Sequence, residues 1–262
     1  MEDNLEVTKN KYSIPQMTIA FIVLTVIYSF RNIIFLNVAF FKSNNGELLL
    51  AVIGLIISLI CAHFANIFAG KSFGIFVRRI KQGKVLWLTF FFTLSVIIIY
   101  YGKVSQWIET AHQPLFTMVT IFLSAIAAGL CEEFLFRDLL FNIFTKLFVK
   151  QRYVLILPAI LSSLCFGLLH FINLIRQTFT VTAQQVIVVT AMGLMFCTIR
   201  ILTNNMWPSV IMHIAFDISP VVLTGDALAP WSSIIVIFIW ISGISLLTIW
   251  AYHHHCLKER LN

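Results

Sequence analysis

Charged residues are scarce in this chain. Only 11% of its 262 residues are Asp, Glu, Lys or Arg, whereas 60% are hydrophobic, and the mean hydropathy is +0.93. Soluble domains average about 25% charged and roughly 45–50% apolar residues. A soluble core of this size cannot hide so much apolar surface. The composition therefore excludes a cytosolic enzyme, a secreted disulfide scaffold and a disordered tail.

Cysteine is sparse as well. Of the five cysteines, Cys61, Cys131, Cys165 and Cys197 lie inside apolar segments without the spacing of a metal site. We interpret them as reduced, small hydrophobic residues. The 25 phenylalanines fit lipid-facing helices better than the alternating strands of a membrane β-barrel. The predicted fold class is an all-α, polytopic membrane protein.

Eight apolar runs predict about eight transmembrane helices, because roughly 20 apolar residues cross a bilayer. The runs are 15–40, 48–69, 84–102, 115–148, 153–174, 184–202, 206–223 and 231–251. The fourth run is too long for one crossing, so we expect its far end to extend into water as an amphipathic helix. The acidic N-terminus lacks the positive charge of a cleavable signal peptide, so we expect the first helix to remain.

The basic residues predict an orientation in the membrane. The net charge is +7, and the Lys and Arg residues lie mostly in the loops between apolar runs, which favours helix orientation over nucleic-acid binding. Most of them, Arg200 included, fall on the side of the chain ends, and only Lys42, Lys103 and Arg176 fall on the other. The positive-inside rule then places both termini in the cytoplasm, as an even number of spans also requires.

Ionisable residues inside the spans mark a candidate site. An ionisable group at mid-bilayer costs roughly 2.5–3.5 kcal/mol on insertion, so such groups usually gather where they are used. Here they concentrate in three of the eight runs. The sequences are Cys131-Glu132-Glu133-Phe134-Leu135-Phe136-Arg137-Asp138 in the fourth run, Phe166-Gly167-Leu168-Leu169-His170 in the fifth and His213-Ile214-Ala215-Phe216-Asp217 in the seventh.

Helical spacing refines this prediction. Glu133 and Arg137 are four residues apart, so they share a helix face and are expected to form an ion pair. Glu132 lies about 100° around the helix, without that partner, and is expected to face a cavity. Glu132 and His170 are equally distant in sequence from the turn between the fourth and fifth runs. Two antiparallel helices would therefore bring this carboxylate and this imidazole to one depth.

The chemistry of such a cluster is hydrolytic. A carboxylate held away from water can act as a general base on a water molecule. One imidazole can position that water, and the other, with the group one turn on, can hold an oxyanion. Alternatively, Glu132, His170 and His213 would bind zinc, which commonly takes three protein ligands and a water in catalytic sites. A structural ion pair with two core histidines is the non-catalytic alternative.

The three motifs, in this order on separate membrane helices, resemble those of the CPBP family, the CaaX-protease and bacteriocin-processing (Abi) intramembrane proteases. The resemblance covers the chain from about residue 115 to 224. It implies a conical catalytic bundle core in 115–224, preceded by three transmembrane helices in 1–114. The last helix and a cytoplasmic tail would then occupy 225–262.

The resemblance also implies roles for the residues of the fourth and fifth runs. Glu132 matches the glutamate that activates water, and Glu133 with Arg137 matches the pair that braces it. His170 matches the histidine that assists the water.

His213 and Asp217 match the pair that binds the oxyanion. The family has Asn or Asp at this last position, and an ionised Asp repels an oxyanion. Asp217 is therefore expected to be protonated, to bind a metal or to orient His213. Zinc is the one cofactor considered, held by Glu132, His170 and His213 if it is used, and the sequence leaves the metal and glutamate mechanisms both open.

The predicted function is therefore that of an intramembrane endopeptidase, of glutamic or metallo type, which hydrolyses a membrane-associated peptide or protein. The family branch and the short loops favour a bacterial cytoplasmic membrane, so we expect peptide pheromones, bacteriocin precursors or membrane-protein segments rather than prenylated substrates. Expected partners are the lipid bilayer and a peptide substrate, with no nucleic acid. The alternatives are a non-catalytic regulator, a bacteriocin-immunity protein and a proton-coupled transporter, although transporters use paired broken helices in two halves.

Overall fold

The computed structural model describes residues 11–34, 44–70, 83–149, 151, 153–221 and 229–261. Within these ranges every regular element is helical, as predicted from the composition. The elements are α1 (Ile14–Ile34), α2 (Asn44–Ala69), α3 (Gly83–Ala111), α4 (Leu115–Glu132), η3 (Glu133–Leu140), α5 (Phe141–Leu147), α6 (Ile156–Leu169), η4 (His170–Ile175), α7 (Phe179–Thr203), α8 (Trp207–Asp217) and α10 (Trp231–Leu261). Lys42, predicted on the side opposite the termini, lies outside the described residues.

Six helices of the described chain are long and apolar enough to cross a bilayer. They are Asn45–Ala69, Val85–Ala111, Leu115–Leu147, Ile156–Ile175, Phe179–Thr203 and Trp231–His254. The seventh predicted span is shorter than expected, because α8 has 11 residues. The first predicted span corresponds to the 21 residues of α1, and its last part, 35–40, lies outside the described residues. At 1.5 Å per residue α8 is about 16 Å long, half the thickness of the hydrocarbon core.

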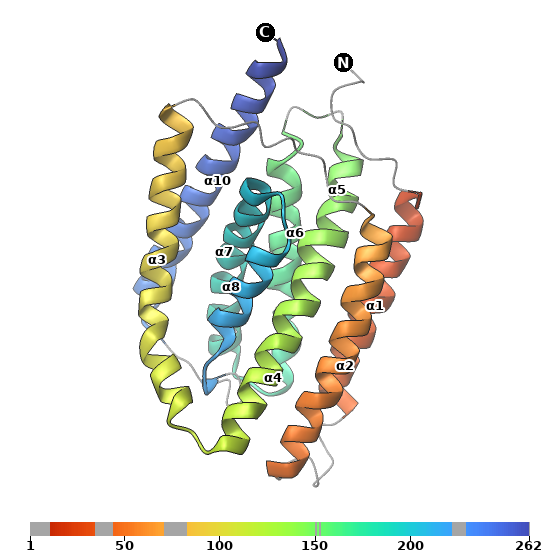
Figure 1. The fold of residues 1–262 in the computed structure, drawn as a ribbon, viewed down its shortest axis with the longest axis vertical. Helices are drawn as coiled ribbons and strands as arrows, with labels where there is room; N and C mark the ends of the chain where they lie inside the picture. The colour runs from red at the N-terminus through yellow and green to blue at the C-terminus, as the bar shows by residue number, and fades with distance from the viewer. Residues whose placement is uncertain are drawn as a thin grey trace.

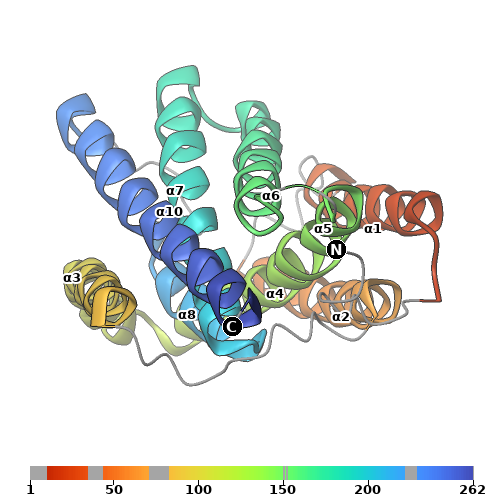
Figure 2. The ribbon, with the colours of Figure 1, turned by 90° about the horizontal axis from the view of Figure 1, so that it is seen from above.

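The helix from Leu115 to Leu147 forms the centre of the bundle (Figures 1 and 2). α1 and α2 pack on one side of it, and α6, α7 and α8 pack on the other. α10 lies against α7 and α3, so α3 completes the far side of the bundle. Residues from almost every element therefore meet around the middle of this one helix.

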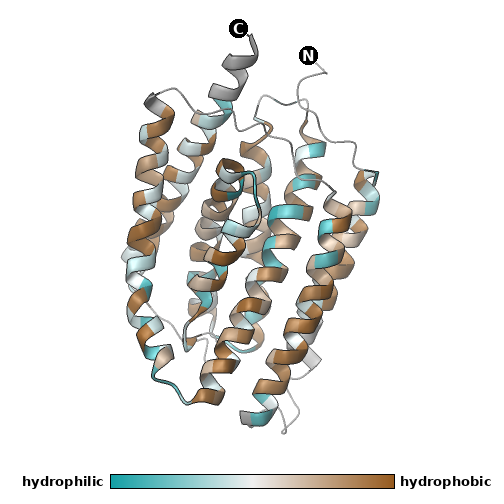
Figure 3. Ribbon diagram, viewed as in Figure 1, coloured by the Kyte–Doolittle hydropathy of each residue, from teal (hydrophilic) through white to brown (hydrophobic). Residues whose placement is uncertain are grey.

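Hydrophobic residues predominate along the helices, as expected for a protein surrounded by lipid (Figure 3). Large hydrophobic side chains are widely exposed on the outer helices, for example Trp87 on α3 at 65% and Ile239 on α10 at 64%. A soluble monomer rarely exposes apolar patches of this extent. The chain is thus a multi-pass membrane protein.

The start of α1 and the end of α10 lie at the same end of the bundle (Figure 1). Near the first, the Lys146 ammonium donates to the Tyr12 carbonyl oxygen at 2.9 Å. Near the second, Tyr252 of α10 packs with Val154 and Leu155, which follow α5 in the chain. Which membrane face this end occupies stays a prediction from the basic residues.

The middle of the central helix is not α-helical. Residues Glu133–Leu140 form a π-helical segment, η3, between α4 and α5. The wider π turn is uncommon and is found mostly as short insertions at functional sites. All residues of η3 except Phe134 are buried, among them Arg137 and Asp138. The fourth run was predicted as an ordinary long helix, so this segment is a difference from the prediction.

Candidate active site

Two adjacent glutamates stand where α4 becomes η3, and they have different surroundings. The Glu132 side chain is 12% exposed and lines a pocket, whereas Glu133 is fully buried. This difference follows the predicted angle of about 100° between them. The first carboxylate is open to a small molecule, and the second is sealed inside the protein.

Glu133 and Arg137 form the ion pair expected from their spacing. Arg137 Nη1 lies 3.3 Å from Glu133 Oε1, and both side chains are fully buried. The Arg137 guanidinium also lies over the ring of Phe166, 4.0 Å from its centroid, and 5.6 Å from that of Phe196. Such aromatic faces stabilise a desolvated cation. Gly193 leaves room for this group, because a Cβ there would lie 3.0 Å from Arg137 Nη2.

His213 is enclosed by three carboxylates. Its Nδ1 lies 2.8 Å from Glu133 Oε1, and its Nε2 lies 3.6 Å from Glu132 Oε2 and 3.5 Å from Asp217 Oδ2. The ring stacks on Phe196 with centroids 5.0 Å apart. A carboxylate can only accept, so the Nδ1 proton donates to Glu133 and fixes the ring. The Nε2 edge then faces the two carboxylates that line the pocket.

The close approach of α4 and α8 makes this contact possible. Gly129 stands one turn before the glutamates, and a Cβ there would lie 2.5 Å from Ile214 Cγ1 and 3.0 Å from the Ile214 backbone nitrogen. Small residues allow membrane helices to pack at short distance. The absence of a side chain at Gly129 therefore sets the spacing at which His213 reaches Glu133.

His170 lies at the point where α6 ends and the 3-10 segment η4 begins. Its Nδ1 is 2.9 Å from the Phe166 carbonyl oxygen, and its ring packs edge-on against Phe166 with centroids 4.8 Å apart. Because the carbonyl accepts, the proton is on Nδ1, and Nε2 of the neutral ring is an acceptor. An acceptor nitrogen at the pocket wall suits a water molecule.

One pocket of about 510 Å³ brings four of the six predicted site residues together. Its wall carries Glu132, His170, His213 and Asp217. Its other polar residues are Tyr28, Ser29, Lys103, Gln106, Asn173, Arg176, Gln177, Gln184, Gln185 and Ser219. Half-buried Gln106 lies in the last turns of α3, and this end of α3 is opposite the start of α1 and the end of α10 (Figure 1). Glu133 and Arg137 are buried behind the wall.

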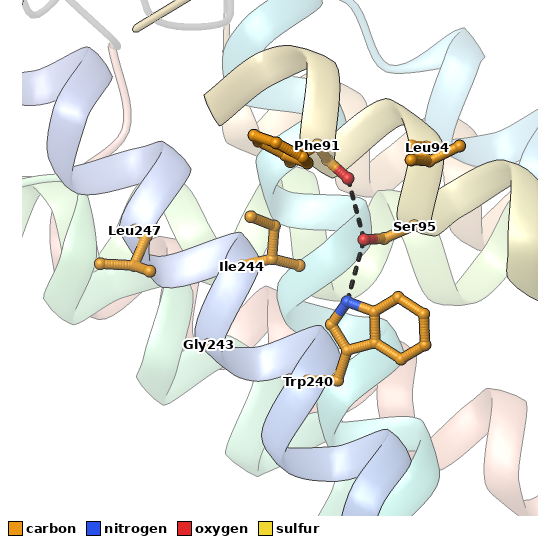
Figure 4. A pocket seen from close by; sticks show the side chains of 7 residues that line it. All are labelled: Phe91, Leu94, Ser95, Trp240, Gly243, Ile244 and Leu247. Atoms are coloured by element: carbon orange, nitrogen blue, oxygen red, sulfur yellow. Dashed lines mark hydrogen bonds between the residues drawn. The ribbon is translucent and has the colours of Figure 1, made fainter. Parts of the chain in front are cut away.

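A second pocket, between α3 and α10, is of a different kind (Figure 4). It is lined by Phe91, Leu94, Ser95, Trp240, Gly243, Ile244 and Leu247. Its polar groups bond to each other: the Trp240 indole donates to Ser95 Oγ at 3.0 Å, and that hydroxyl donates to the Phe91 carbonyl oxygen. With its polar atoms satisfied and its wall apolar, this groove suits a lipid chain rather than chemistry.

Aromatic residues of α1 and α3, which the sequence did not indicate as site residues, donate hydrogen bonds to the site. The Tyr28 hydroxyl donates to Glu132 Oε1 at 2.9 Å. The Tyr100 hydroxyl donates to the Met212 carbonyl oxygen, and Trp107 Nε1 donates to the Ala215 carbonyl oxygen at 2.8 Å. The last two acceptors flank His213 on α8. In an apolar helix these aromatic residues carried no sequence signal of a polar role.

A second buried ion pair lies one turn beyond the first. Arg200 Nη2 is 2.9 Å from Asp138 Oδ1 and 3.2 Å from Asn142 Oδ1, and Asn142 donates to the Ala69 carbonyl oxygen at 3.3 Å. Arg200 was predicted as an orienting charge at the membrane surface. This interpretation was wrong, because Arg200 lies within α7 and is 5% exposed. The pair instead ties α7 to η3, and Asn142 of α5 ties α2 to the next turn of the same helix.

The predicted zinc ligands do not fit a zinc ion. In the part of the chain that the structure describes, no group of three or more His, Cys, Asp or Glu side chains is placed to hold a metal. Glu132, His170 and His213 line one pocket without converging on one point. These residues are therefore not assigned as zinc ligands.

Part of the chain matches a known protein family. Residues 114–219 match the family model described as type II CAAX prenyl endopeptidase Rce1-like. The match agrees with the resemblance to the CPBP family, and it includes all six predicted site residues, from Glu132 to Asp217. Searches of curated proteins and of solved structures each gave no match. α1, α2 and α3 lie outside the matched segment.

Proposed function

Since residues 114–219 belong to the Rce1-like family, we propose that this protein is an intramembrane endopeptidase in which Glu132 activates the hydrolytic water. The observation that carries the proposal is the pocket wall, where an accessible carboxylate and two oriented imidazoles face one cavity inside an apolar bundle. The proposal assigns each of the six site residues to binding, proton transfer or support.

Glu132 is the general base. Its Oε2 faces His213 and the pocket, so a water between Glu132 and His170 can give its proton to this oxygen. As the water oxygen bonds to the substrate carbonyl carbon, the C=O π electrons move to the carbonyl oxygen, which becomes an oxyanion. His170, through its acceptor Nε2, orients the same water.

His213 stabilises the oxyanion. Three carboxylates around one imidazole favour the form that is protonated on both nitrogens, so that Nδ1–H bonds to Glu133 and Nε2–H is available to the substrate. A fixed donor in a water-poor site stabilises developing negative charge strongly. When the tetrahedral intermediate collapses, the C–N bond breaks and Glu132 passes its proton to the leaving amine.

Glu133, Arg137 and Asp217 support this chemistry without touching the reacting atoms. Arg137 compensates the buried Glu133 charge, and Glu133 in turn holds His213. Asp217, one turn after His213 on α8, lies 3.5 Å from His213 Nε2 and orients the ring. An ionised carboxylate would repel an oxyanion, so orientation of His213 is the role that fits Asp217 best.

The substrate proposed is a peptide segment that reaches the pocket from the membrane. The pocket wall beyond the site carries amide side chains such as Gln106 and Gln185, which can bond to a peptide backbone. We place the protein in a bacterial cytoplasmic membrane with both termini in the cytoplasm. The prenyl group named in the family description is not part of the proposed substrate, because prenylation is a eukaryotic modification.

A cleavage screen tests the proposal. Wild type, Glu132→Gln and Glu109→Gln are reconstituted in proteoliposomes with a library of membrane-active peptides, and the products are identified by mass spectrometry. Glu109 is an exposed carboxylate on α3 and serves as the matched control. We expect products from wild type and Glu109→Gln, none from Glu132→Gln and no effect of a zinc chelator.

Three results would contradict parts of the proposal. Equal cleavage by Glu132→Gln would remove Glu132 from the mechanism. Loss of cleavage with the chelator would replace the glutamate mechanism by a metal mechanism. Binding of a peptide without cleavage by any of the three proteins would favour the regulator or immunity function.

A further inference from the structure

We infer that Tyr28 of α1 is a positioning residue for Glu132, so that the active site includes a helix outside the segment that matches the family model. This inference rests on the proposed function, because it deepens the assignment of Glu132 as the base. Tyr28 is 5% exposed and its hydroxyl donates to Glu132 Oε1 at 2.9 Å. The two residues are 104 positions apart in the chain.

The two oxygens of Glu132 have separate partners. Oε1 accepts from Tyr28, and Oε2 lies 3.6 Å from His213 Nε2. A carboxylate bound at one oxygen cannot rotate freely about its last torsion. The Tyr28 bond therefore directs Oε2 toward His213 and the cavity, where the proposed water would lie. Oε2 then takes the proton from the water and gives it to the leaving amine in every turnover.

The position of Tyr28 is itself well fixed. It belongs to the buried cluster that joins α1 to η3, together with Leu24, Leu135 and Phe136. The Phe21 ring, two turns earlier on α1, packs edge-on against Phe136 with centroids 5.4 Å apart. Apolar contacts on both sides hold α1 against η3. The hydroxyl is thus carried on a rigid element to the Glu132 carboxylate at the pocket wall.

A hydrogen bond to an ionised group favours the ionised form. Without the Tyr28 hydroxyl, the Glu132 carboxylate would lose this stabilisation and its fixed direction together. Bonds of this kind to a charged group contribute about ten- to hundred-fold in an equilibrium or a rate. We therefore expect Tyr28→Phe to lower kcat about ten- to hundred-fold with KM little changed. The acid limb of its pH–rate profile is expected to move to higher pH.

The test compares Tyr28→Phe with Tyr101→Phe, which removes the same hydroxyl from an exposed tyrosine on α3. Infrared spectra in nanodiscs provide a readout that needs no substrate: the carboxylate band that Glu132→Gln removes belongs to Glu132. This band is expected to shift in Tyr28→Phe and to stay unchanged in Tyr101→Phe. Thermal unfolding of both variants checks that the bundle is intact.

The outcomes separate this inference from the proposed function. An active Glu132→Gln protein would overturn the function, whatever Tyr28 does. An inactive Glu132→Gln protein with a Tyr28→Phe variant that matches wild type in rate, pH profile and infrared band would leave the function standing and overturn the role of Tyr28. A Tyr28→Phe variant that loses activity without any change in the band or the pH profile would show a merely structural role and would also overturn it.

Discussion

The imidazole Nδ1 of His213 lies 2.8 Å from Oε1 of Glu133, and this contact joins α8 to the π-helical segment of the central helix. The same carboxylate oxygen is 3.3 Å from Arg137 Nη1. A single buried oxygen of Glu133 therefore contacts both His213, which is proposed to bind the oxyanion, and Arg137, whose positive charge balances the charge of Glu133. Both contacts are buried. The charge of Glu133 must therefore be balanced by its neighbours within the protein and not by water.

The first prediction concerns this charge balance. Glu133→Gln leaves the Arg137 guanidinium buried without its counter-charge, and breaking a buried ion pair costs about 3–5 kcal/mol. We expect the melting temperature in detergent to fall and activity to be lost. The double variant Glu133→Gln/Arg137→Met removes the stranded charge as well, so it should recover most of the stability and none of the activity. Recovery of activity in the double variant would show that Glu133 is not needed to hold His213.

The second prediction concerns the distance between α4 and α8. In Gly129→Ala the new Cβ meets both the Ile214 side chain and the Ile214 backbone, so α8 must move away. A displacement of about 1 Å at a reacting group can cost on the order of a hundred-fold in rate. We expect kcat to fall about ten- to hundred-fold. Gly102→Ala on α3 is the matched control, because a Cβ there meets nothing within 4 Å.

A third prediction concerns the bonds from α3 to α8. Trp107→Phe removes the donor to the Ala215 carbonyl oxygen, one of the last four carbonyls of α8 that lack a partner within the helix. We expect a several-fold fall in kcat, because the C-terminal half of α8 carries His213 and Asp217. Trp240→Phe removes a similar indole bond, to Ser95, away from the site and should leave kcat unchanged. Equal effects of the two substitutions would argue against a special role of α3.

The fourth prediction concerns the side from which the substrate enters. Gln106 lines the pocket from the last turns of α3, and this end of α3 lies opposite the start of α1 and the end of α10 (Figure 1). We infer that the mouth of the pocket is at this end. With the termini in the cytoplasm, as proposed, the mouth faces outward. A membrane-impermeant thiol reagent should therefore label Gln106→Cys in right-side-out vesicles, and it should label exposed Gln151→Cys only in inverted vesicles. In each case the labelling of the parent protein is subtracted. The reverse pattern would place the termini outside and the mouth in the cytoplasm.

The sequence predicted the parts of the site that depend on local helical spacing. The ion pair of Glu133 with Arg137 and the shared face of His213 and Asp217 follow from a separation of four residues. The common depth of Glu132 and His170 follows from antiparallel helices of equal length around one turn, and both line the same pocket. Their catalytic roles stay predictions, since geometry alone does not test them.

The rest of the site depends on contacts between distant helices, which spacing does not reveal. Tyr28 and Trp107 look like ordinary lipid-facing or core residues of apolar helices, and only the packing of α1 and α3 gives them polar partners. Arg200 lies near the end of its apolar run, so position alone suggested a surface charge, whereas its partner Asp138 is 62 residues away. The π-helical segment needs a shift in backbone hydrogen bonds that leaves no mark on hydrophobic periodicity.

The most direct test of the account is a single-turnover measurement with Glu132→Gln in nanodiscs at saturating substrate, alongside a measurement of substrate affinity. Gln keeps the size of Glu and removes the base. We predict an unchanged Kd and a rate lowered by about 10²–10⁴-fold, the usual contribution of general acid–base catalysis. A Glu132→Gln protein that binds and cleaves at the wild-type rate would contradict the central claim that this carboxylate activates the water.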